Sequence, residues 1–255
     1  MRPHRLRDDQ WDLIKDGLPG RAGSAGVTAA GNRRFADAVI HRYRTGIPWR
    51  DLPESFGGWN NTHRRWSRWA TSGVWPGILV ILATDADNEY AMTGSTIARA
   101  PTQRRRQKKA GEDQAIGKSK GGLSTKIHVL VDALGHPLKI VLTKGQAHDL
   151  NGADALLPGM AAGVLLADKA CDADKRVIEP LTAAGKTAVI PPKSNRETPR
   201  SYDEDLHEAR HLIENFFCWA KQFRAIATRY ERPPEIFWRL FRWPARFPGS
   251  IDDRH

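Results

Sequence analysis

The stretch STKIHVLVDALGHPLKIVLT, residues 124–143, sets the fold class. Its apolar residues alternate with polar ones on both sides of the turn sequence ALGHP, at Ile127, Val129, Val131, Leu138, Ile140 and Leu142. Alternation with a period of two places every second side chain on the same face of a strand. The stretch therefore predicts a β-hairpin with one buried face.

The residues around the hairpin alternate between strand-like and helical segments. A strand is expected from about residue 88, before the hairpin. After the hairpin, buried strands are expected in GVLLAD (163–168) and TAVIPP (187–192). Helices are expected over 150–160, over 172–185 ending at Gly185, and over 204–224. This order predicts a mixed α/β sheet with a parallel part and flanking helices. In such sheets, ligands and catalytic groups collect beyond the carboxyl ends of the parallel strands.

The first 80 residues have helical rather than alternating spacing. NRRFADAVIHRYR (32–44) and NTHRRWSRWA (61–70) each predict a short amphipathic helix. The second helix carries Arg64, Arg65 and Arg68 away from its tryptophans. Two such helices are similar to a helix-turn-helix unit, in which arginines contact DNA phosphates or guanines. A small helical domain with a solvated basic face remains the alternative.

The charge balance indicates a polyanionic partner. The 255 residues carry a formal net charge of +11, which favours nucleic acid over an anionic membrane surface. No apolar run reaches the roughly 18 residues of a membrane span, and the N-terminus lacks the apolar core of a signal peptide. We therefore expect a cytoplasmic protein in which Cys171 and Cys218 are packing residues.

A basic tract, RRRQKKAGEDQAIGKSKGG (104–122), precedes the hairpin. Its composition predicts contact with a phosphate backbone through Lys118 and Lys120, and we include Lys126 on the following strand. The part GEDQAIGKS is similar to a phosphate-binding loop. However, five residues separate its glycines where that loop needs four, which argues against a nucleotide-binding enzyme.

Two positions could carry chemistry. Asp168 ends the buried run VLLAD. It is either a turn residue or helix N-cap, or a metal-binding carboxylate at a strand end, where sites collect. In the helix predicted over 204–224, a charged stripe opposes a core stripe. The charged stripe consists of His207, Arg210, Glu214 and Lys221, and the core stripe of Ala209, Leu212, Ile213, Phe216, Ala220 and Phe223. An Arg210–Glu214 ion pair is the structural interpretation, but Arg before Glu is the weaker orientation.

Gly94 lies in the strand-like stretch NEYAMTGSTIAR, residues 88–99. A glycine in a strand interior reduces stability, because it has no side chain to pack. Either the backbone needs unusual freedom at this point or a functional side chain is missing.

Six blocks together resemble the DDE transposases of bacterial insertion sequences, specifically the IS-five family. They are RRFADAVIHRYRTGIPWRDLPESFGGW, GEDQAIGKSKGGLSTKIHVLVDALGHPL, TKGQAHD, LADKACDAD, VIPPKSNR and RHLIENFFCWAKQFRAIATRY. The resemblance runs from about residue 5 to 230. It implies a helical DNA-binding domain over 1–82, a ribonuclease-H-like catalytic domain over 83–230 and an atypical tail over 231–255.

The resemblance also implies a reaction and a site. Such enzymes cleave and join DNA at terminal inverted repeats, as at least a dimer, with two Mg²⁺ or Mn²⁺ ions held by three carboxylates. Two of these carboxylates match Asp168 and Glu214, and Arg210 and Lys221 match the family's Tyr-Arg-Glu-Lys signature, whose tyrosine position holds His207. The family's first aspartate precedes Ser-Thr, and Gly94 occupies that position here.

These matches and departures predict a nucleoid-associated bacterial transposase that keeps two of three metal-binding carboxylates and is impaired in catalysis. The alternative is a DNA-binding remnant, or a repressor of related elements, without nuclease function. Pro101 and Cys171 also depart from the family pattern. The tail after Tyr230 contains four prolines, at 233, 234, 244 and 248, and has neither helical nor strand period. A shifted reading frame is one hypothesis for its origin.

Overall fold

The computed structural model describes residues 4–20, 31–75, 78, 86–100, 115–198 and 200–229. The chain forms two compact units, one from residues 1–85 and 220–255 and the other from residues 86–219. The sequence places the second boundary after residue 230, whereas the residues from 220 on group with the first unit. Within the described ranges, no helix is long and apolar enough to cross a membrane.

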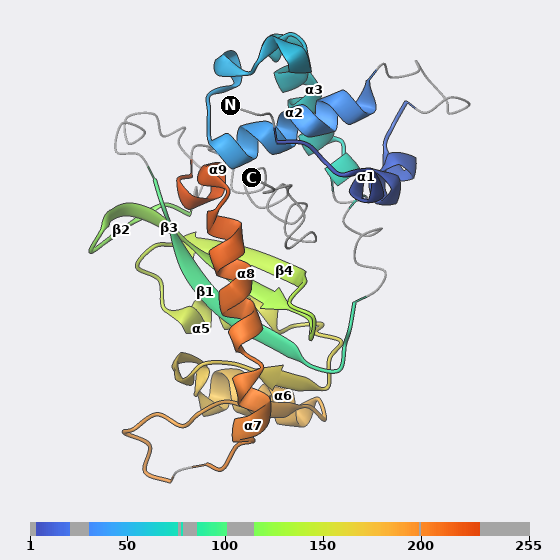
Figure 1. Ribbon diagram of the computed structural model, residues 1–255. Coiled ribbons are helices and arrows are strands. Elements are labelled where there is room, and N and C mark those ends of the chain that lie inside the picture. Colours follow the sequence, from blue (N-terminus) through green and yellow to red (C-terminus); the bar gives the residue numbers. More distant parts are fainter. Residues whose placement is uncertain are drawn as a thin grey trace. The chain divides into compact units, whose positions relative to one another are not determined.

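The first unit is helical (Figure 1). Its helices are α1 (Asp8–Ile14), α2 (Asn32–Thr45), α3 (Trp59–Thr71) and α9 (Arg224–Ala227), so the two predicted helices at 32–44 and 61–70 are confirmed. Aromatic rings form its core, where Phe35 of α2 meets Trp69 of α3 edge-on at 4.8 Å between ring centroids. Trp69 also contacts Trp75 at 5.4 Å.

The segment around α9 completes this helical unit. Gly46 ends α2 with φ of +70°, and a Cβ atom there would lie 2.8 Å from Cβ of Arg224. The guanidinium of Arg44 donates to Oε1 of Gln222 at 2.9 Å and lies over the ring of Phe223 at 5.3 Å. Glycine at position 46 therefore serves both the left-handed helix end and the close approach of α9.

The second unit is built on a mixed sheet. Its strands are β1 (Ala91–Arg99), β2 (Gly117–Ser119), β3 (Gly122–Val131), β4 (Pro137–Lys144), β5 (Val164–Leu166) and β6 (Thr187–Val189). Among the described residues the strand order is β2-β3-β1-β5-β6, with β4 also paired to β3. The β3–β4 hairpin is antiparallel, and β5 runs parallel to both β1 and β6. The predicted mixed α/β sheet with flanking helices is therefore confirmed.

Helices cover both faces of this sheet (Figure 1). On one face, α5 (Asp149–Leu156) buries Leu150 and Leu156 against Leu130 of β3 and Leu165 of β5. On the other face, α8 (His211–Lys221) lies next to β1 at Gly94. The core of this unit is therefore split between the two faces, and successive residues of β1 face different helices.

The two helices predicted over 172–185 and 204–224 are not regular. The first begins as a π-helical segment (Asp174–Ile178) and continues as α6 (Glu179–Ala183). The second consists of α7 (Glu204–Glu208), α8 and α9. Between α7 and α8 the backbone N–H groups of residues 209, 210, 212 and 213 bond three residues back, which tightens the chain and interrupts the α-helix.

The break changes the predicted stripes. Ile213, Phe216, Ala220 and Phe223 are buried as expected, but Leu212 and Ala209 are only half-buried. Phe217, which the predicted stripe omitted, is buried. Ala209 and Leu212 differ because a tightened turn advances each residue by more than the 100° expected of a continuous helix. Phe217 lies one α-helical turn after Ile213, next to the predicted stripe.

Candidate active site

Asp168 lies beyond the carboxyl end of β5, where the parallel strands of the sheet end. It caps a 3₁₀ turn (Lys169–Cys171), because its Oδ1 accepts the backbone N–H of Ala170 at 2.5 Å. Its side chain is half exposed, and its second oxygen is directed toward Arg210. The cap interpretation of Asp168 is therefore confirmed. Its place at a strand end is also as expected, while its metal-binding role stays a prediction.

Arg210 connects Asp168 to Glu214. One guanidinium nitrogen, Nη2, lies 3.9 Å from Oδ2 of Asp168 and 3.2 Å from Oε1 of Glu214. The Nε atom of Arg210 is buried and has no hydrogen-bond partner within the described part of the chain. The structure thus brings together three residues predicted for the site, with a cation between the two carboxylates.

Gly94 faces the helix that carries Glu214. It pairs with Val129 of β3, and a Cβ atom at this position would lie 3.0 Å from Cδ1 of Ile213 and 3.2 Å from Cε2 of Phe217. Gly94 is not among the glycines with positive φ, so an L-residue could adopt its backbone conformation. Backbone freedom therefore does not explain this glycine. Close packing by α8 is a second feature of the position, which the sequence pattern did not reveal.

The donor set does not fit the two-ion site that the resemblance implies. Within the described ranges, no group of three or more His, Cys, Asp or Glu side chains could hold a metal ion. Asp168 and Glu214 supply anionic oxygens, while Arg210 supplies a positive charge between them. Mg²⁺ needs oxygen ligands in near-octahedral geometry, so the residues present fall short of such a site.

The other two signature residues lie elsewhere. His207 belongs to α7, before the break, and its Nε2 bonds the backbone carbonyl of Ala167 at 3.1 Å. It is therefore not part of a charged stripe on α8. Lys221 is the exposed last residue of α8.

The residues predicted to contact DNA divide into two groups. Arg64 and Arg68 on α3 are exposed, as are Lys118 and Lys120 near β2. Arg65 instead lies over the rings of Phe35 and Trp69, 4.5 and 4.7 Å from their centroids, and bonds the side-chain oxygen of Asn32. Burial lowers the pKa of Arg65. This arginine has a packing role that its helical position did not indicate.

Lys126 also has partners within the protein. Its ammonium group donates to the carbonyl of Ala147 at 2.9 Å and lies 3.2 Å from Oδ1 of Asp149. Ser95 donates to the same carboxylate oxygen. Burial would raise the pKa of Asp149, but the hydrogen bond from Ser95 and the charge of Lys126 outweigh it and lower that pKa. The network on the α5 face of the sheet was missed from sequence, although TKGQAHD contains its carboxylate.

Next to this network lies a buried histidine. The ring of His128 is 2% exposed and bonds Oγ1 of Thr143 at 2.8 Å, and burial lowers its pKa to about 4. A Cβ atom on Gly152 would lie 2.1 Å from Nδ1 of His128, so helix α5 can approach the sheet only with glycine at this position. His128 is therefore neutral and structural at neutral pH.

The two cysteines differ from each other. Cys171, inside the turn after Asp168, is buried as predicted, and burial raises the pKa of its thiol to about 12. Cys218 on α8 is exposed, so its assignment as a packing residue was wrong. The basic residues 104–109, Pro101 and the tail after residue 229 lie outside the described residues.

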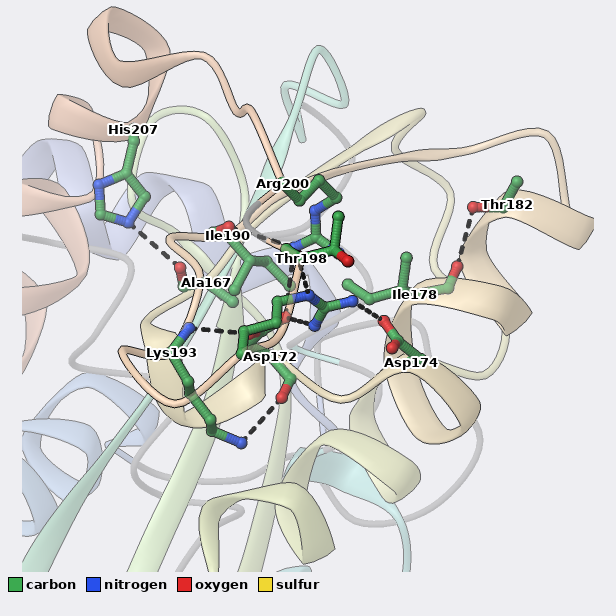
Figure 2. Close-up of polar contacts among 11 residues, drawn as sticks. Ala167, Asp172, Asp174, Ile178, Thr182, Ile190, Lys193, Thr198, Arg200 and His207 are labelled. Carbon is green, nitrogen blue, oxygen red and sulfur yellow. Dashed lines mark hydrogen bonds and ion pairs between the residues drawn. The ribbon is translucent and has the colours of Figure 1, made fainter.

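A second polar network, also missed from sequence, surrounds Asp172 (Figure 2). The side chain of Asp172 is 1% exposed and accepts from Nη1 of Arg196 at 2.6 Å and from the backbone N–H of Lys193 at 2.9 Å. Arg200 lies 3.5 Å from the same carboxylate. The sequence signal was present in the blocks LADKACDAD and VIPPKSNR, but the pairing of the two blocks required the fold.

Comparisons with known proteins match both parts of the chain. Residues 6–79 match the family described as putative transposase of IS4/5 family, and residues 94–242 match the transposase DDE domain. A putative transposase for the insertion sequence element IS6501 of Brucella ovis is 38% identical over 116 residues, which are 45% of this chain and 89% of that protein. The uncharacterized protein y4sN of Sinorhizobium fredii is 43% identical over 95 residues, 37% of this chain and 76% of that protein.

One solved structure is also similar. It is a cryo-EM structure of the piggyBac transposase synaptic complex with hairpin DNA, with a TM-score of 0.48 and 8% sequence identity. The similarity covers 93% of this chain and 70% of that chain.

Proposed function

Because this chain belongs to the DDE transposases, and by its N-terminal match to the IS4/5 family, we propose that it binds the terminal inverted repeats of an insertion sequence but is impaired in DNA cleavage and strand transfer. DNA is the partner on which this family acts, and DDE domains generally depend on divalent metal ions. The observation that carries the proposed impairment is Gly94, which faces the helix of Glu214 without offering an oxygen.

The chemistry explains why one missing carboxylate matters. Phosphoryl transfer at two metal ions requires ligands that hold both ions about 4 Å apart. We propose Mg²⁺, or Mn²⁺, as the ions that a complete site would take. Asp168 and Glu214 would be their protein ligands, and Arg210 and Lys221 would contribute positive charge near the DNA. With Gly94 at the third position, the site lacks one of the three carboxylate ligands that would surround the ions.

DNA binding does not depend on this defect. The exposed Arg64, Arg68, Lys118 and Lys120 support phosphate contacts, and the net charge of +11 favours association with DNA. We propose that the protein acts as a homodimer, since two element ends must be joined, and that it is associated with the bacterial nucleoid.

Binding and cleavage assays with the DNA that flanks the gene test this function. The purified chain is expected to bind end-containing DNA more tightly than unrelated DNA, with an affinity that falls linearly on a log–log plot against salt. It is expected to cleave that DNA poorly with either Mg²⁺ or Mn²⁺. Efficient metal-dependent cleavage by the unaltered chain would contradict the proposed impairment, and failure to prefer end-containing DNA would contradict the proposed function.

The alternative is a DNA-binding remnant or repressor, which the missing carboxylate also favours. Such a protein would bind the same DNA, so binding does not separate the two. A cleavage assay of the Gly94→Asp variant separates the two functions. A transposase with one lost ligand gains activity, whereas a remnant whose remaining site has decayed does not.

A further inference from the structure

The chain around Asp168 is held at two points. Immediately before Asp168, the carbonyl of Ala167 is bonded by Nε2 of His207 at 3.1 Å. Immediately after the 3₁₀ turn, Asp172 is bonded by Lys193 and Arg196. All three holding residues lie in the segment that follows β6, which is described over residues 190–198 and 200–207 and which we call the strap.

The strap holds Asp172 through its backbone as well as its side chain (Figure 2). The backbone N–H of Lys193 donates to Oδ2 of Asp172 at 2.9 Å, and the ammonium group of the same lysine donates to the backbone oxygen of Asp172 at 2.8 Å. Because donors from one residue reach both groups, the end of the turn cannot shift without breaking charge-assisted hydrogen bonds.

Arg196 is committed to this network. Its Nη1 donates to Asp172 at 2.6 Å, its Nε donates to the carbonyl of Thr198 at 3.2 Å, and its Nη2 bonds Asp174. Each of the three nitrogens of the guanidinium thus has an acceptor inside the protein. This arginine is therefore an internal anchor rather than a group kept available for DNA phosphates.

His207 fixes the other side of the turn. A backbone carbonyl only accepts hydrogen bonds, so Nε2 of His207 must carry the hydrogen. The ring of His207 meets Tyr202 edge-on at 5.6 Å, which limits its rotation. The donor at Nε2 is thus presented to Ala167 in one orientation.

We propose that Asp172, Arg196 and His207 are positioning residues that hold Asp168 in place opposite Arg210 and Glu214. This inference rests on the proposed function, because it gives Asp168 a role in DNA cleavage. The side chain of Asp168 is half exposed, and its short contact is to Ala170 inside its own turn. Its location is therefore set by where the turn sits, and a displacement of about 1 Å in an active site can cost on the order of a hundredfold in rate.

The first arm of the test measures the turn directly and needs no catalytic activity. In a chain with Cys218→Ser, the buried Cys171 is the remaining cysteine and lies one residue before Asp172. Its labelling by a thiol reagent, well below the melting temperature, reports opening of the turn. Arg196→Met and Asp172→Asn are expected to raise the labelling rate about tenfold or more, and Arg196→Lys by less.

A matched control is available in the same unit. Arg176 bonds Asp154 at 2.5 Å and Asn151 at 3.0 Å, so Arg176→Met removes an ion-paired arginine that does not touch the turn. Its labelling rate should stay within about twofold of the parent, as for an exposed pair of small energetic effect. Equal labelling in Arg196→Met and the parent, or an equal rise in Arg176→Met, would overturn the proposal. Circular dichroism melts identify any variant that unfolds as a whole, and Arg196→Lys then supplies the comparison.

The second arm measures cleavage in a chain that also carries Gly94→Asp. Arg196→Met and His207→Phe are expected to lower the single-turnover cleavage rate roughly 10- to 100-fold, with DNA affinity within about twofold. His207→Tyr, which restores a donor, should recover most of the rate. An unchanged rate in these variants would contradict the positioning role. If Gly94→Asp does not cleave DNA at all, the proposed function fails, while the labelling arm still decides whether the strap holds the turn.

Discussion

The two ends of the candidate site are built differently. At the end of β5, Asp168 lies in a turn tied to the strap by Asp172, and the surrounding contacts are charged hydrogen bonds. In the middle of β1, Gly94 faces the apolar side chains of Ile213 and Phe217. One end therefore has a carboxylate with polar supports, whereas at the other end a glycine packs against apolar side chains.

This difference shows that the elements that position a site can form independently of one side chain in it. The parallel strands and α8 bring Asp168 and Glu214 to one guanidinium without any help from position 94. Polar supports are costly to disturb because they leave buried groups without partners, while a glycine under apolar side chains is a stable arrangement by itself. The proposed loss of a ligand at position 94 is thus compatible with a folded site.

The largest effect is expected from removing the carboxylates that remain. In a chain with Gly94→Asp, the further change Asp168→Asn or Glu214→Gln should lower single-turnover cleavage on the order of 10²–10³-fold, because each removes an anionic oxygen from a preorganised site. The exposed Asp205 on α7 supplies the control Asp205→Asn, which should leave the rate unchanged. A small effect of both site changes would mean that DNA is cleaved elsewhere.

The second prediction concerns the framework end. Asp172→Asn should reduce the free energy of unfolding by about 1–3 kcal/mol at pH 7, because charged donors lose their acceptor. Burial would raise the pKa of Asp172, but the bonds from Lys193 and Arg196 outweigh it, so the pKa lies below the ordinary 3.8. Its contribution is therefore present above pH 3.8 and is lost as the pH falls through the lowered folded-state pKa.

Urea denaturation at a series of pH values checks this prediction. The gap in stability between the parent and Asp172→Asn should be widest at neutral pH and should close in acid. Asp174→Asn is the matched control, because Asp174 bonds the same arginine but is exposed. A gap that persists unchanged below the folded-state pKa would show that the charge of Asp172 is not what matters.

The third prediction tests the apolar end. Ile213→Val removes the Cδ1 atom that a side chain at position 94 would meet at 3.0 Å. In the parent chain this change should cost about 0.5–1.5 kcal/mol of stability, as in other cores. In a Gly94→Asp chain the cost should be smaller by about 0.5–1 kcal/mol, since the removed atom no longer crowds the new carboxylate.

The control for this cycle is Ile190→Val, a fully buried site in the core cluster on the α5 side of the sheet. Its cost should be the same with Gly94 and with Gly94→Asp. Identical costs of Ile213→Val in the two backgrounds would mean that Gly94 and α8 do not pack as described.

The smallest effect on stability is expected at Arg210. Its partner Glu214 is 58% exposed, and an exposed ion pair at this spacing contributes about 0.5 kcal/mol or less. Arg210→Met should therefore change the unfolding free energy little, as measured by chemical denaturation. A loss well above 1 kcal/mol would favour the interpretation that this arginine serves stability rather than the site.

Local patterns predicted much of the fold. The hairpin of β3 and β4 and the helix α2 follow from apolar spacing over neighbouring residues, which the sequence states directly. The break between α7 and α8 was not predictable in this way, because hydrogen bonds from residues 209–213 to carbonyls three residues back leave no pattern in residue type. The helix was therefore predicted as continuous.

The candidate site was predictable only in part. Asp168 was singled out by its place at a strand end and Glu214 by the charged stripe of its helix, and the family resemblance paired them. Their shared contact with Arg210 supports that pairing. The partners of Lys126 and Arg65 were missed because Asp149 and Phe35 are distant in sequence, so these cations looked available for DNA. The spacing of apolar residues is visible in the sequence, whereas contacts between side chains distant in sequence become known only from the fold.

The most direct test of the central claim compares Gly94→Asp with Gly94→Asn. The two side chains have nearly the same size and meet the same atoms of Ile213 and Phe217, but only aspartate supplies an anionic oxygen. With Mg²⁺ and DNA that carries the element ends, Gly94→Asp is predicted to cleave at least about a hundredfold faster than both Gly94→Asn and the unaltered chain. Efficient cleavage by the unaltered chain, or equal rates for the two variants, would contradict the account of Gly94 as the position of a lost carboxylate.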